Sequence, residues 1–540
     1  MRNRAVILLA LAATLALPFA FRPRVPVPGS AADTVVVITP HNAAIRDEFG
    51  AGFSRWYKAR TGRSVFVDWR VVGGTSEIGR YLESQYVASF RNLWVSMPGR
   101  AWSSAVQAGF QSGRASPDDP QEVRDARAAF LASDAGCGID VFFGGGPLDF
   151  DRQAASGRLV DSGLRALHPD WFTPAVLPAT LGGQEQVGRS DLWIGSVLSS
   201  FGILYNRDSL RRLGFEREPG QWSDLADPRF LGEIGMCDPT KSGSIVQAFA
   251  NVVQQQIHAR LDALRAADPA ADPRQATARA VRLGWSDGLR LLQLVGANAR
   301  YFTDSSQKPT IDVAAGDCAA GMCIDFYGRE EQESVRRRGG GERLGYVSPP
   351  GGAAYSVDPI ALLRGAPDRP VAVAFIEYVL SLDGQKLWNF RPGTPGGPAE
   401  YALRRLPVRR DFYAHGEWRQ YRSDPDEDPY EQKRLLVFHN EWTARLFYEL
   451  AFDVRVMTED VHPELVSAWR AIIAAPEPAR SRALEALQDV SAVDYDQSLG
   501  RITRALASRN QVDELVLARE LGDTFRANYR RAEAIARGGP

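Results

Sequence analysis

Residues 193–206 read WIGSVLSSFGILYN, and this stretch decides the fold. It is a run of apolar and small side chains without a charge, which predicts one long strand from Trp193 to Tyr205. On both sides of it, short apolar strands alternate with helical patterns. The stretch therefore divides an α/β chain into two parts.

The part before this strand predicts a sheet covered by helices. Apolar strands are expected at 34–39, 65–71 and 138–143, and a helix at 43–60. Continuous apolar strands separated by helices are typical of a parallel sheet with helices on both faces. Residues 87–136 interrupt this alternation with a polar segment and are interpreted as a surface insertion.

The part after this strand repeats the alternation and then changes character. The pattern predicts strands at 232–237, 316–326, 344–347 and 357–363, and helices at 245–257, 285–297 and 370–380. Residues 404–429 are charged and contain proline. From 430 to 537 nearly all of the sequence has helical periodicity, with apolar stripes that must pack on each other or on the rest of the protein.

The composition is that of an ordinary globular protein. Its 540 residues include 44% hydrophobic and 24% charged side chains, and 64 Lys and Arg balance 65 Asp and Glu. This excludes a disordered chain and a protein with many membrane spans. Nucleic-acid binding is not expected, because the basic excess that such binding uses is missing.

The first 32 residues are typical of an export signal. Arg2 and Arg4 precede an apolar run from Ala5 to Phe21, and Ser30-Ala31-Ala32 supplies small residues for a signal peptidase. We interpret residues 1–32 as a signal peptide cleaved near Ala32, which predicts a periplasmic protein. An uncleaved membrane anchor is the alternative.

Six motifs, in order along residues 33–410, resemble one family. They are VVVITPHN (35–42), DVFFGGG (140–146), WIGSVLSSFGILYN (193–206), WSDLADPRFLGEIGMCDPTKSGS (222–244), VAAGDCAAGMCIDFY (313–327) and LLRGAPDRPVAVAFIEYVLSLDGQ (362–385). This series resembles the extracellular solute-binding proteins of bacterial ABC importers, in the group that binds ferric ion, thiamine or phosphonate.

The resemblance implies an α/β, two-lobed type 2 periplasmic-binding fold, here with an extra, mostly helical C-terminal extension. We expect lobe I at 33–198 with the insertion at about 87–136, lobe II at 199–343, a return to lobe I at 344–410, and the extension at 411–540. The resemblance implies a monomer that captures a small anionic or metal-containing solute between the lobes and delivers it to the permease subunits of an importer. The long central strand would be a hinge between the lobes.

The turn Asp238–Ser244 is the sharpest local signal for a ligand site. It joins a strand to a helix, and it combines free backbone N–H groups with Lys241 and the hydroxyls of Ser242 and Ser244, next to Gly243. Such a turn is suited to an anion. The alternative is that Ser242 or Ser244 only caps the helix.

Other candidate ligand contacts lie at further strand ends. Gly73-Gly74-Thr75-Ser76 is the corresponding turn of lobe I, and there Thr75 and Ser76 are the candidates. Gly145 would let the backbone approach a ligand closely. Asp304 lies in a loop of lobe II, and Ser199 lies in the central strand; plain turns and solvated loops remain the alternatives.

The resemblance also permits a test for iron. Ferric-binding members use a His on the first loop, a Glu after the third strand and two adjacent Tyr. Here His41 and Tyr327 match, whereas Phe326 replaces the first Tyr and Gly145 or a neighbour replaces the Glu. Asp325 could add a carboxylate, although on a strand it would face away from Phe326. A conventional ferric site is therefore not expected, and the identity of any metal stays open.

The sequence predicts a binding protein, not an enzyme. It lacks the C-x-x-C, H-E-x-x-H, G-x-S-x-G and Walker motifs, and no cofactor is expected.

The four cysteines are expected as buried thiols, with one bridge such as Cys237 to Cys318 as the alternative. A different function class is a periplasmic receptor or sensor that presents its helical C-terminal region to a partner protein.

Overall fold

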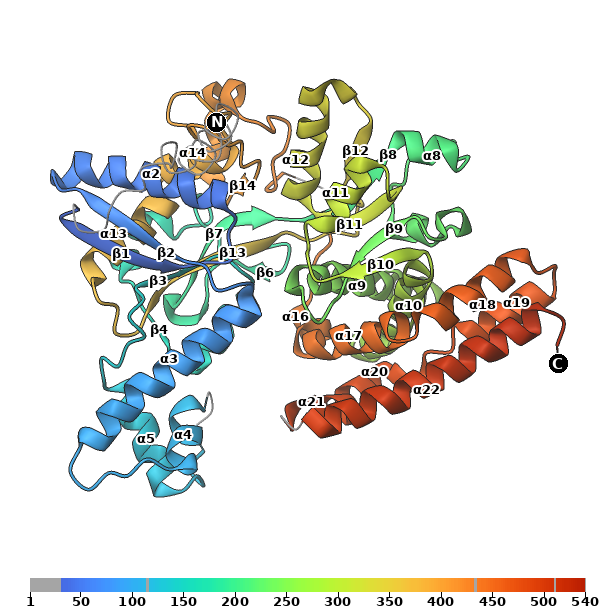
Figure 1. Ribbon diagram of the computed structural model, residues 1–540, viewed down its shortest axis with the longest axis horizontal. Helices are drawn as coiled ribbons and strands as arrows, with labels where there is room; N and C mark the ends of the chain where they lie inside the picture. The colour runs from blue at the N-terminus through green and yellow to red at the C-terminus, as the bar shows by residue number, and fades with distance from the viewer. Residues whose placement is uncertain (1–30, 113–115, 432–434, 509–510, 540) are drawn as a thin grey trace, which may run out of the picture.

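The computed structural model describes residues 31–112, 116–431, 435–508 and 511–539 (Figure 1). The predicted signal peptide lies outside these residues, apart from Ala31 and Ala32. The described chain forms two lobes, each built around a mixed sheet. The strand order is β14-β7-β13-β3-β1-β2 in lobe I, where β4 also pairs with β13, and β10-β9-β11-β8-β12 in lobe II. The predicted two-lobed α/β fold is confirmed.

Lobe I begins with three parallel strands, as the sequence indicates. β1 (Asp33–Ile38) pairs in parallel with β2 (Val65–Arg70) and with β3 (Val141–Phe143). Each strand leads at its carboxyl end into a helix, namely α2 (Ala43–Thr61), α3 (Thr75–Ser96) and α6 (Pro147–Ala155). The turns after these strands therefore meet at one edge of the sheet, where a ligand is expected in open α/β sheets.

The central strand is two strands that belong to different sheets. β7 (Ile194–Ser199) lies in lobe I and β8 (Phe201–Asn206) lies in lobe II, so the chain crosses at Ser200. β7 and β8 run antiparallel to their neighbours, unlike the all-parallel sheet expected from the sequence. The reason is that a crossing strand enters each sheet from the side of the other lobe.

The return to lobe I begins later than expected. β12 (Leu344–Val347) pairs with β8 in lobe II, and β13 (Ser356–Leu363) pairs with β3 and β7 in lobe I. The second crossing therefore lies between Val347 and Ser356, and the predicted boundary at 344 is wrong. The apolar strand pattern of β12 does not specify which of the two sheets it joins.

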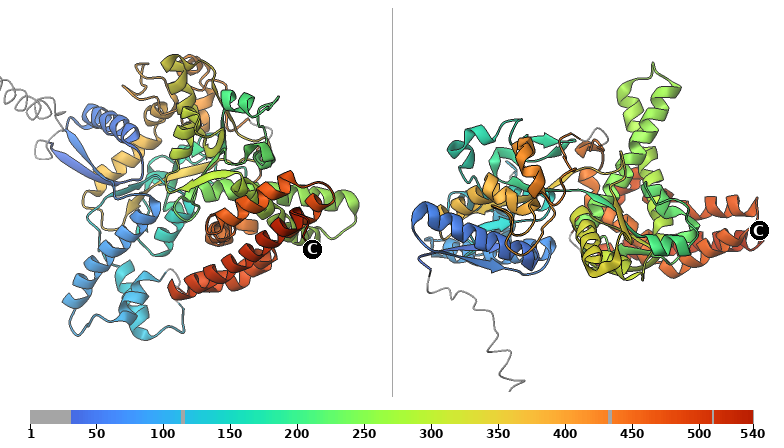
Figure 2. Two further views of the ribbon diagram at one scale, coloured as in Figure 1. Left: turned by 45° about the vertical axis from the view of Figure 1, so that its right-hand side comes forward. Right: turned by 90° about the horizontal axis from the view of Figure 1, so that it is seen from above.

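Lobe II repeats the strand-to-helix plan with two long helices. The strands are β9 (Ile234–Cys237), β10 (Ala299–Thr303) and β11 (Ala320–Ile324). The helices α9 (Gly243–Ala267) and α10 (Pro273–Ala297) pack on each other, and their far ends project from the lobe as a hairpin (Figure 2). Both helices are longer than their apolar stripes predict, because the outer turns are polar.

The insertion of lobe I is an arm with a small aromatic core. α3 continues into it, and α4 (Ser104–Gln111) and α5 (Gln121–Leu131) pack on each other. Phe90, Phe110 and Phe130 are buried together there, with ring centroids of neighbouring pairs 4.8–5.4 Å apart. The polar segment predicted as a surface insertion thus belongs to a helical unit.

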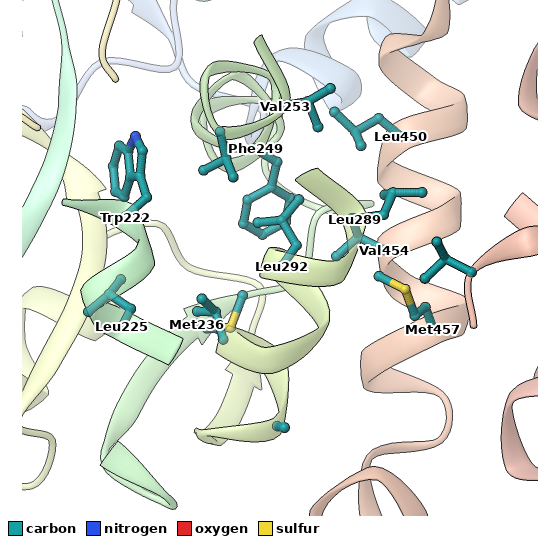
Figure 3. Close-up of a cluster of buried hydrophobic side chains, with 14 of the residues drawn as sticks. Trp222, Leu225, Met236, Phe249, Val253, Leu289, Leu292, Leu450, Val454 and Met457 are labelled. Atoms are coloured by element: carbon teal, nitrogen blue, oxygen red, sulfur yellow. The ribbon is translucent and has the colours of Figure 1, made fainter. Parts of the chain in front are cut away.

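Most of the C-terminal extension completes the core of lobe II. The first layer is α17 (Phe447–Val454), whose Leu450 and Val454 lie beside Phe249 and Val253 of α9 and Leu289 of α10 (Figure 3). α18 (His462–Ala474), α19 (Ala479–Leu487) and α22 (Gln511–Ala536) pack outside it. One continuous cluster of buried side chains joins these helices to the sheet of lobe II.

Buried hydrogen bonds fix the extension on α10. The indole N–H of Trp469 donates to Asn298 Oδ1 at 2.9 Å, and that of Trp285 donates to the carbonyl of Val493 at 3.1 Å. The amide of Gln293 donates to Leu487 O and to the hydroxyl of Tyr529, both at 2.9 Å. Since buried polar groups are costly without partners, these bonds specify one arrangement of the helices.

Before it reaches lobe II, the extension packs on lobe I, so the chain crosses between the lobes a third time. Tyr430 donates its hydroxyl to the carbonyl of Val408 in lobe I. Leu436 N then donates to Ala353 O beside the second crossing, and Phe438 N donates to Gly182 O of lobe I at 2.8 Å. His439 N reaches Gln254 of α9 at 2.9 Å.

One buried carboxyl within the extension should depress stability at neutral pH. Asp453 is fully buried; Ser498 Oγ donates to its Oδ2 at 2.6 Å, and its Oδ1 has no partner among the described residues. Burial raises its pKa well above the ordinary 3.8. Because the pKa of Asp453 is higher in the folded protein than in the unfolded chain, the free energy of unfolding decreases as the pH rises from about 3.8 through the pKa of the folded protein.

We therefore expect Asp453→Asn to raise the melting temperature by a few degrees at pH 7–8. Thermal unfolding from pH 4 to pH 8 should show the difference from the natural protein growing with pH. Asp496→Asn, at a largely exposed carboxylate of the same region, is the control without a pH-dependent gain. An equal melting temperature for the Asp453 variant at every pH would contradict the expectation.

All four cysteines are free thiols, so the alternative of a bridge from Cys237 to Cys318 is wrong. Within the described ranges, no helix combines the length and apolarity needed to cross a membrane.

Candidate functional site

The two lobes meet at a junction, and the lobe I side of this junction lies at the carboxyl ends of β1, β2 and β3. Gly144 and Gly145 have φ angles of 92° and 126°. A Cβ on Gly144 would lie 2.4 Å from the ring of His41, and a Cβ on Gly145 would lie 2.5 Å from the methyl group of Thr75. The glycines are thus required for both the backbone conformation and the close approach. The structure brings His41, Thr75 and Gly145 into one corner.

Asp149 lies in the same corner, in the first turn of α6. Burial raises its pKa, opposed by a hydrogen bond with Thr75. Ser76, the neighbouring candidate, is exposed. Thr75 is therefore already engaged by a carboxyl, whereas Ser76 faces solvent.

The centre of the junction is the buried guanidinium of Arg405. Its Nη1 lies 2.6 Å from Asp358 Oδ2 and 3.5 Å from His41 Nε2, and its Nη2 donates to the hydroxyl of Ser199. His41 Nε2 is 3.3 Å from the same Asp358 oxygen. The side chain of Arg405 is 1% exposed, that of His41 5% and that of Asp358 21%.

A backbone turn places Arg405 in this position. Arg404 has a φ of 50°, in the left-handed region that costs a non-glycine residue on the order of 1–2 kcal/mol. Arg405 N donates to Trp388 O at 2.9 Å, and Asn389 donates to Arg405 O at 3.1 Å. β14 (Leu406–Pro407) then pairs with β7. These contacts hold the strained turn.

The electrostatics of this cluster follow from its burial and pairing. Burial tends to raise the pKa of Asp358, but Arg405 and His41 outweigh it and lower that pKa to about 2. Burial lowers the pKa of His41 despite the nearby carboxylate. The cluster therefore holds an ionised Asp358–Arg405 pair beside a neutral His41 at physiological pH.

Lobe II contributes Asp325, Phe326 and Tyr327, which begin a helix and do not continue a strand. β11 ends at Ile324, and α12 (Asp325–Val335) follows. The prediction that Asp325 and Phe326 lie on opposite faces of a strand is wrong, because Asp325 accepts from the N–H of Phe326 at 2.9 Å and starts the helix. The ring of Phe326 packs against Arg405, whose Cζ is 4.5 Å from the ring centroid.

Asp325 and Tyr327 have different surroundings. Asp325 is fully buried and lies 3.4 Å from Arg329; burial raises its pKa to about 6, opposed by Arg329 and Arg405. Burial also raises the pKa of Tyr327, with Arg405 acting against it. Asp325 is thus committed to an internal ion pair, whereas Tyr327 is a neutral phenol whose ring packs on that of Phe326, with centroids 4.3 Å apart.

Further charged pairs join the lobes at this place. Arg404 of lobe I donates to the carbonyl of Arg329 in α12 at 2.8 Å and pairs with Asp424. Arg329 in turn lies 3.4 Å from Glu427 in the part of the extension that packs on lobe I. Charged residues that scatter through the sequence thus form one network across the junction.

The predicted anion turn of lobe II begins α9. Ser242 is its N-cap, accepting from Ile245 N at 3.5 Å, and Asp238 Oδ1 accepts from Thr240 N at 2.7 Å. Gly243 is exposed and Ser244 is half-buried. The first turn of α9 carries no acidic residue. The capping alternative therefore describes Ser242, and Ser244 remains a candidate ligand contact.

Two carboxyls lie near this turn. Asp304 directly follows β10 and raises the pKa of Cys237, together with burial and Asp238. Glu459 of the extension was not predicted; burial and Asp238 raise its pKa to about 7. Arg405, Arg329 and Glu459 could not be predicted as site residues, because none of them belongs to a sequence motif.

This architecture, with polar side chains gathered where two lobes meet around crossing strands, is that of the two-lobed binding proteins to which the sequence motifs are similar. Residues 187–410 match the family of bacterial extracellular solute-binding proteins. The match confirms the predicted resemblance over this segment, which is less than half of the chain.

The chain is also similar to an uncharacterized protein of Haemophilus influenzae. The two are 26% identical over 250 residues, which cover 46% of this chain and 60% of the relative, so the match spans less than two thirds of that protein.

Similar solved structures include three binding proteins. The periplasmic binding protein AfuA from Actinobacillus pleuropneumoniae, with fructose-6-phosphate bound, is 17% identical with a TM-score of 0.49, over 81% of this chain and 98% of that one. Iron-bound HitA from Pseudomonas aeruginosa is 16% identical with a TM-score of 0.45, over 78% and 99%. The spermidine/putrescine-binding protein PotD from Streptococcus pneumoniae is 14% identical with a TM-score of 0.44, over 78% and 99%.

Proposed function

We propose that this chain is the extracytoplasmic solute-binding component of an ABC importer and that it captures a small anionic solute between its lobes. It would act by binding and delivery to permease subunits, without catalysis. A solute that touches both lobes binds the closed form better and so shifts the population toward closure.

The observation that carries the preference for an anion is the position of Arg405. A guanidinium always carries its charge and offers donors that match carboxylate and phosphate groups. Arg405 lies between His41 and Phe326, where it meets side chains of both lobes, and its Nε has no partner among the described residues. On lobe II, the free N–H groups of the acid-free first turn of α9 and the side chain of Lys241 are donors for an anion, although Asp238 and Glu459 lie near them.

The same observation weighs against a metal held by His41, Asp325 and Tyr327. His41 Nε2 already lies 3.3 Å from Asp358 Oδ2 and 3.5 Å from Arg405 Nη1, so a metal ion bound there would compete with the guanidinium for the same carboxylate. Asp325 is paired with Arg329, and burial disfavours the tyrosinate form of Tyr327. Within the described residues, no group of three or more His, Cys, Asp or Glu side chains is placed to hold a metal ion.

Binding of a panel of solutes tests the proposal. Native mass spectrometry of the exported protein would first identify what it carries. Calorimetry would then compare inorganic phosphate, sugar phosphates and dicarboxylates with ferric citrate and with spermidine. We expect binding only among the anions and no tyrosinate-to-iron absorption in the visible range. Binding of spermidine alone, or a visible iron band abolished by Tyr327→Phe, would overturn the anionic assignment.

Ser242 and Ser244 allow capping to be separated from binding. Ser242→Ala should lower stability by about 1 kcal/mol, because α9 loses its N-cap. Ser244→Ala should leave the melting temperature unchanged and weaken solute binding by about 1–3 kcal/mol, the cost of one lost hydrogen bond to the solute. Unchanged affinity in the Ser244 variant would remove this turn from the proposed site.

One observation favours the receptor or sensor function as a second candidate. Leu515 and Val516 in the first turns of α22 are 66% and 61% exposed, which is unusual for two adjacent large apolar side chains. Replacing both by Ser should abolish capture of a partner protein if the extension presents this face. Solute uptake unchanged by that double replacement would favour the importer function alone.

A further inference from the structure

The part of the C-terminal extension that packs on lobe II also makes an exposed contact with lobe I. The guanidinium carbon of Arg152 lies 3.8 Å from the ring centroid of Tyr448. Arg152 belongs to α6 of lobe I, and Tyr448 belongs to α17, which packs on α9 of lobe II. α16 (Asn440–Thr443) and α17 lie on the side of lobe II that faces lobe I (Figures 1 and 2).

This contact lies at the edge of the candidate solute site. α6 follows directly on the Gly144–Gly145 turn, and Asp149 and Arg152 are three residues apart, on one face of the helix. Asp149 interacts with Thr75 on one side and electrostatically with Tyr448 on the other. α6 thus links the corner formed by Thr75 and Gly145, at its start, to the Arg152–Tyr448 contact one turn further along the helix.

The contact contributes to the relative position of the lobes more than to the stability of either one. Tyr448 is 38% exposed and Arg152 is exposed, so neither belongs to a hydrophobic core. A cation over an aromatic face at such a site contributes modestly, and the contribution depends on the ring and not on the hydroxyl. Any movement that separates α6 from α17 breaks it.

We propose that Tyr448 and Arg152 form a latch that closes the solute cleft from the side of the C-terminal extension. The latch forms only when the lobes approach each other, so it raises the closed population before any solute arrives. Its effect on solute affinity rests on the proposed function, whereas its effect on lobe opening does not. A chain that ends after the return to lobe I, at about residue 410, has no such contact.

Spin labels on the two lobes would measure the latch directly. Lys58→Cys on α2 and Arg338→Cys after α12 are exposed attachment points, in a full-length background with Cys137→Ser to remove the half-buried thiol. In the solute-free protein, Arg152→Ala and Tyr448→Ala should each shift the ratio of open to closed lobes about two- to five-fold toward open. The double variant should shift it no further than either single variant.

Two variants provide matched controls. Tyr448→Phe keeps the ring and should keep the natural distance distribution. Arg229→Ala removes a similar stacked pair inside lobe II, where Arg229 lies 3.9 Å from the ring centroid of Phe215, and should not open the lobes. Unchanged distances in the Arg152 and Tyr448 variants, or an effect equal to that of Arg229→Ala, would overturn the latch. A shifted distance without any anion binding would leave the latch standing and remove the proposed solute class.

Discussion

Truncation after Arg410 should leave an insoluble or strongly destabilised protein, because lobe II loses one wall of its core. Leu450, Val454 and Met457 cover the apolar faces of α9 and α10 (Figure 3), and each large side chain removed from water stabilises by about 1.5–3 kcal/mol. The three together contribute about 4.5–9 kcal/mol, which is comparable to the usual 5–15 kcal/mol of a folded domain. Truncation would also leave Trp285, Gln293 and Asn298 without their partners in the extension.

Expression of the truncated and full-length chains, followed by thermal unfolding of any soluble fraction, measures this effect. A chain that ends after Arg537 is the control; it keeps α22 and should melt like the natural protein. A chain ending at Arg410 that stays soluble, melts at the natural temperature and binds solute would show instead that the extension is a separate module.

Arg405→Met should abolish solute binding and destabilise lobe I by about 3–5 kcal/mol, the usual cost of leaving one member of a buried ion pair alone. The stranded partner is Asp358, whose pKa of about 2 in the natural protein depends first on Arg405 among the groups that lower it. In the natural protein this carboxylate stabilises the fold above its unfolded pKa, and the stabilisation is lost as pH falls toward 2. The stability of the Arg405→Met variant should therefore no longer show this decrease at acid pH.

The double variant Arg405→Met with Asp358→Asn separates folding from binding. Removing both charges should restore most of the stability, because no unpaired charge remains, while solute affinity stays lost. Chemical unfolding and calorimetry on the three proteins give the two readouts. A single Arg405 variant that keeps both stability and affinity would remove this residue from the site.

The sequence was sufficient for elements whose side chains follow a regular pattern. β1 and β9 are mainly apolar runs, β2 is rich in β-branched and aromatic residues, and α2 and α9 show apolar stripes at helical spacing, so their types and approximate places could be predicted. The apolar stripe at 442–454 likewise predicted that the helices of the extension pack on each other or on the rest of the protein. It did not identify α9 and α10 as the surface, because a stripe carries no information on its partner.

The centre of the candidate site could not be predicted, for local reasons. Arg405 lies among the arginines of 404–410, and its burial depends on the left-handed turn at Arg404, which no glycine signals. Asp325 follows an apolar strand with no turn residue, so the change from β11 to α12 leaves no sequence signature. His41, Thr75 and Gly145, by contrast, directly follow predicted strands, and the rule that strand ends meet at one edge brought them together.

The third crossing has a consequence for the order in which the two lobes can fold. The core of lobe I uses side chains only as far as Leu435, whereas that of lobe II combines strands from the middle of the chain with helices that extend to Ala536. A chain that emerges from its N-terminus can therefore complete lobe I while lobe II still lacks its outer helices. Until the last hundred residues arrive, α9 and α10 remain an uncovered apolar surface. We expect chaperone dependence and aggregation during export to be confined to this interval, and to end when α22 docks.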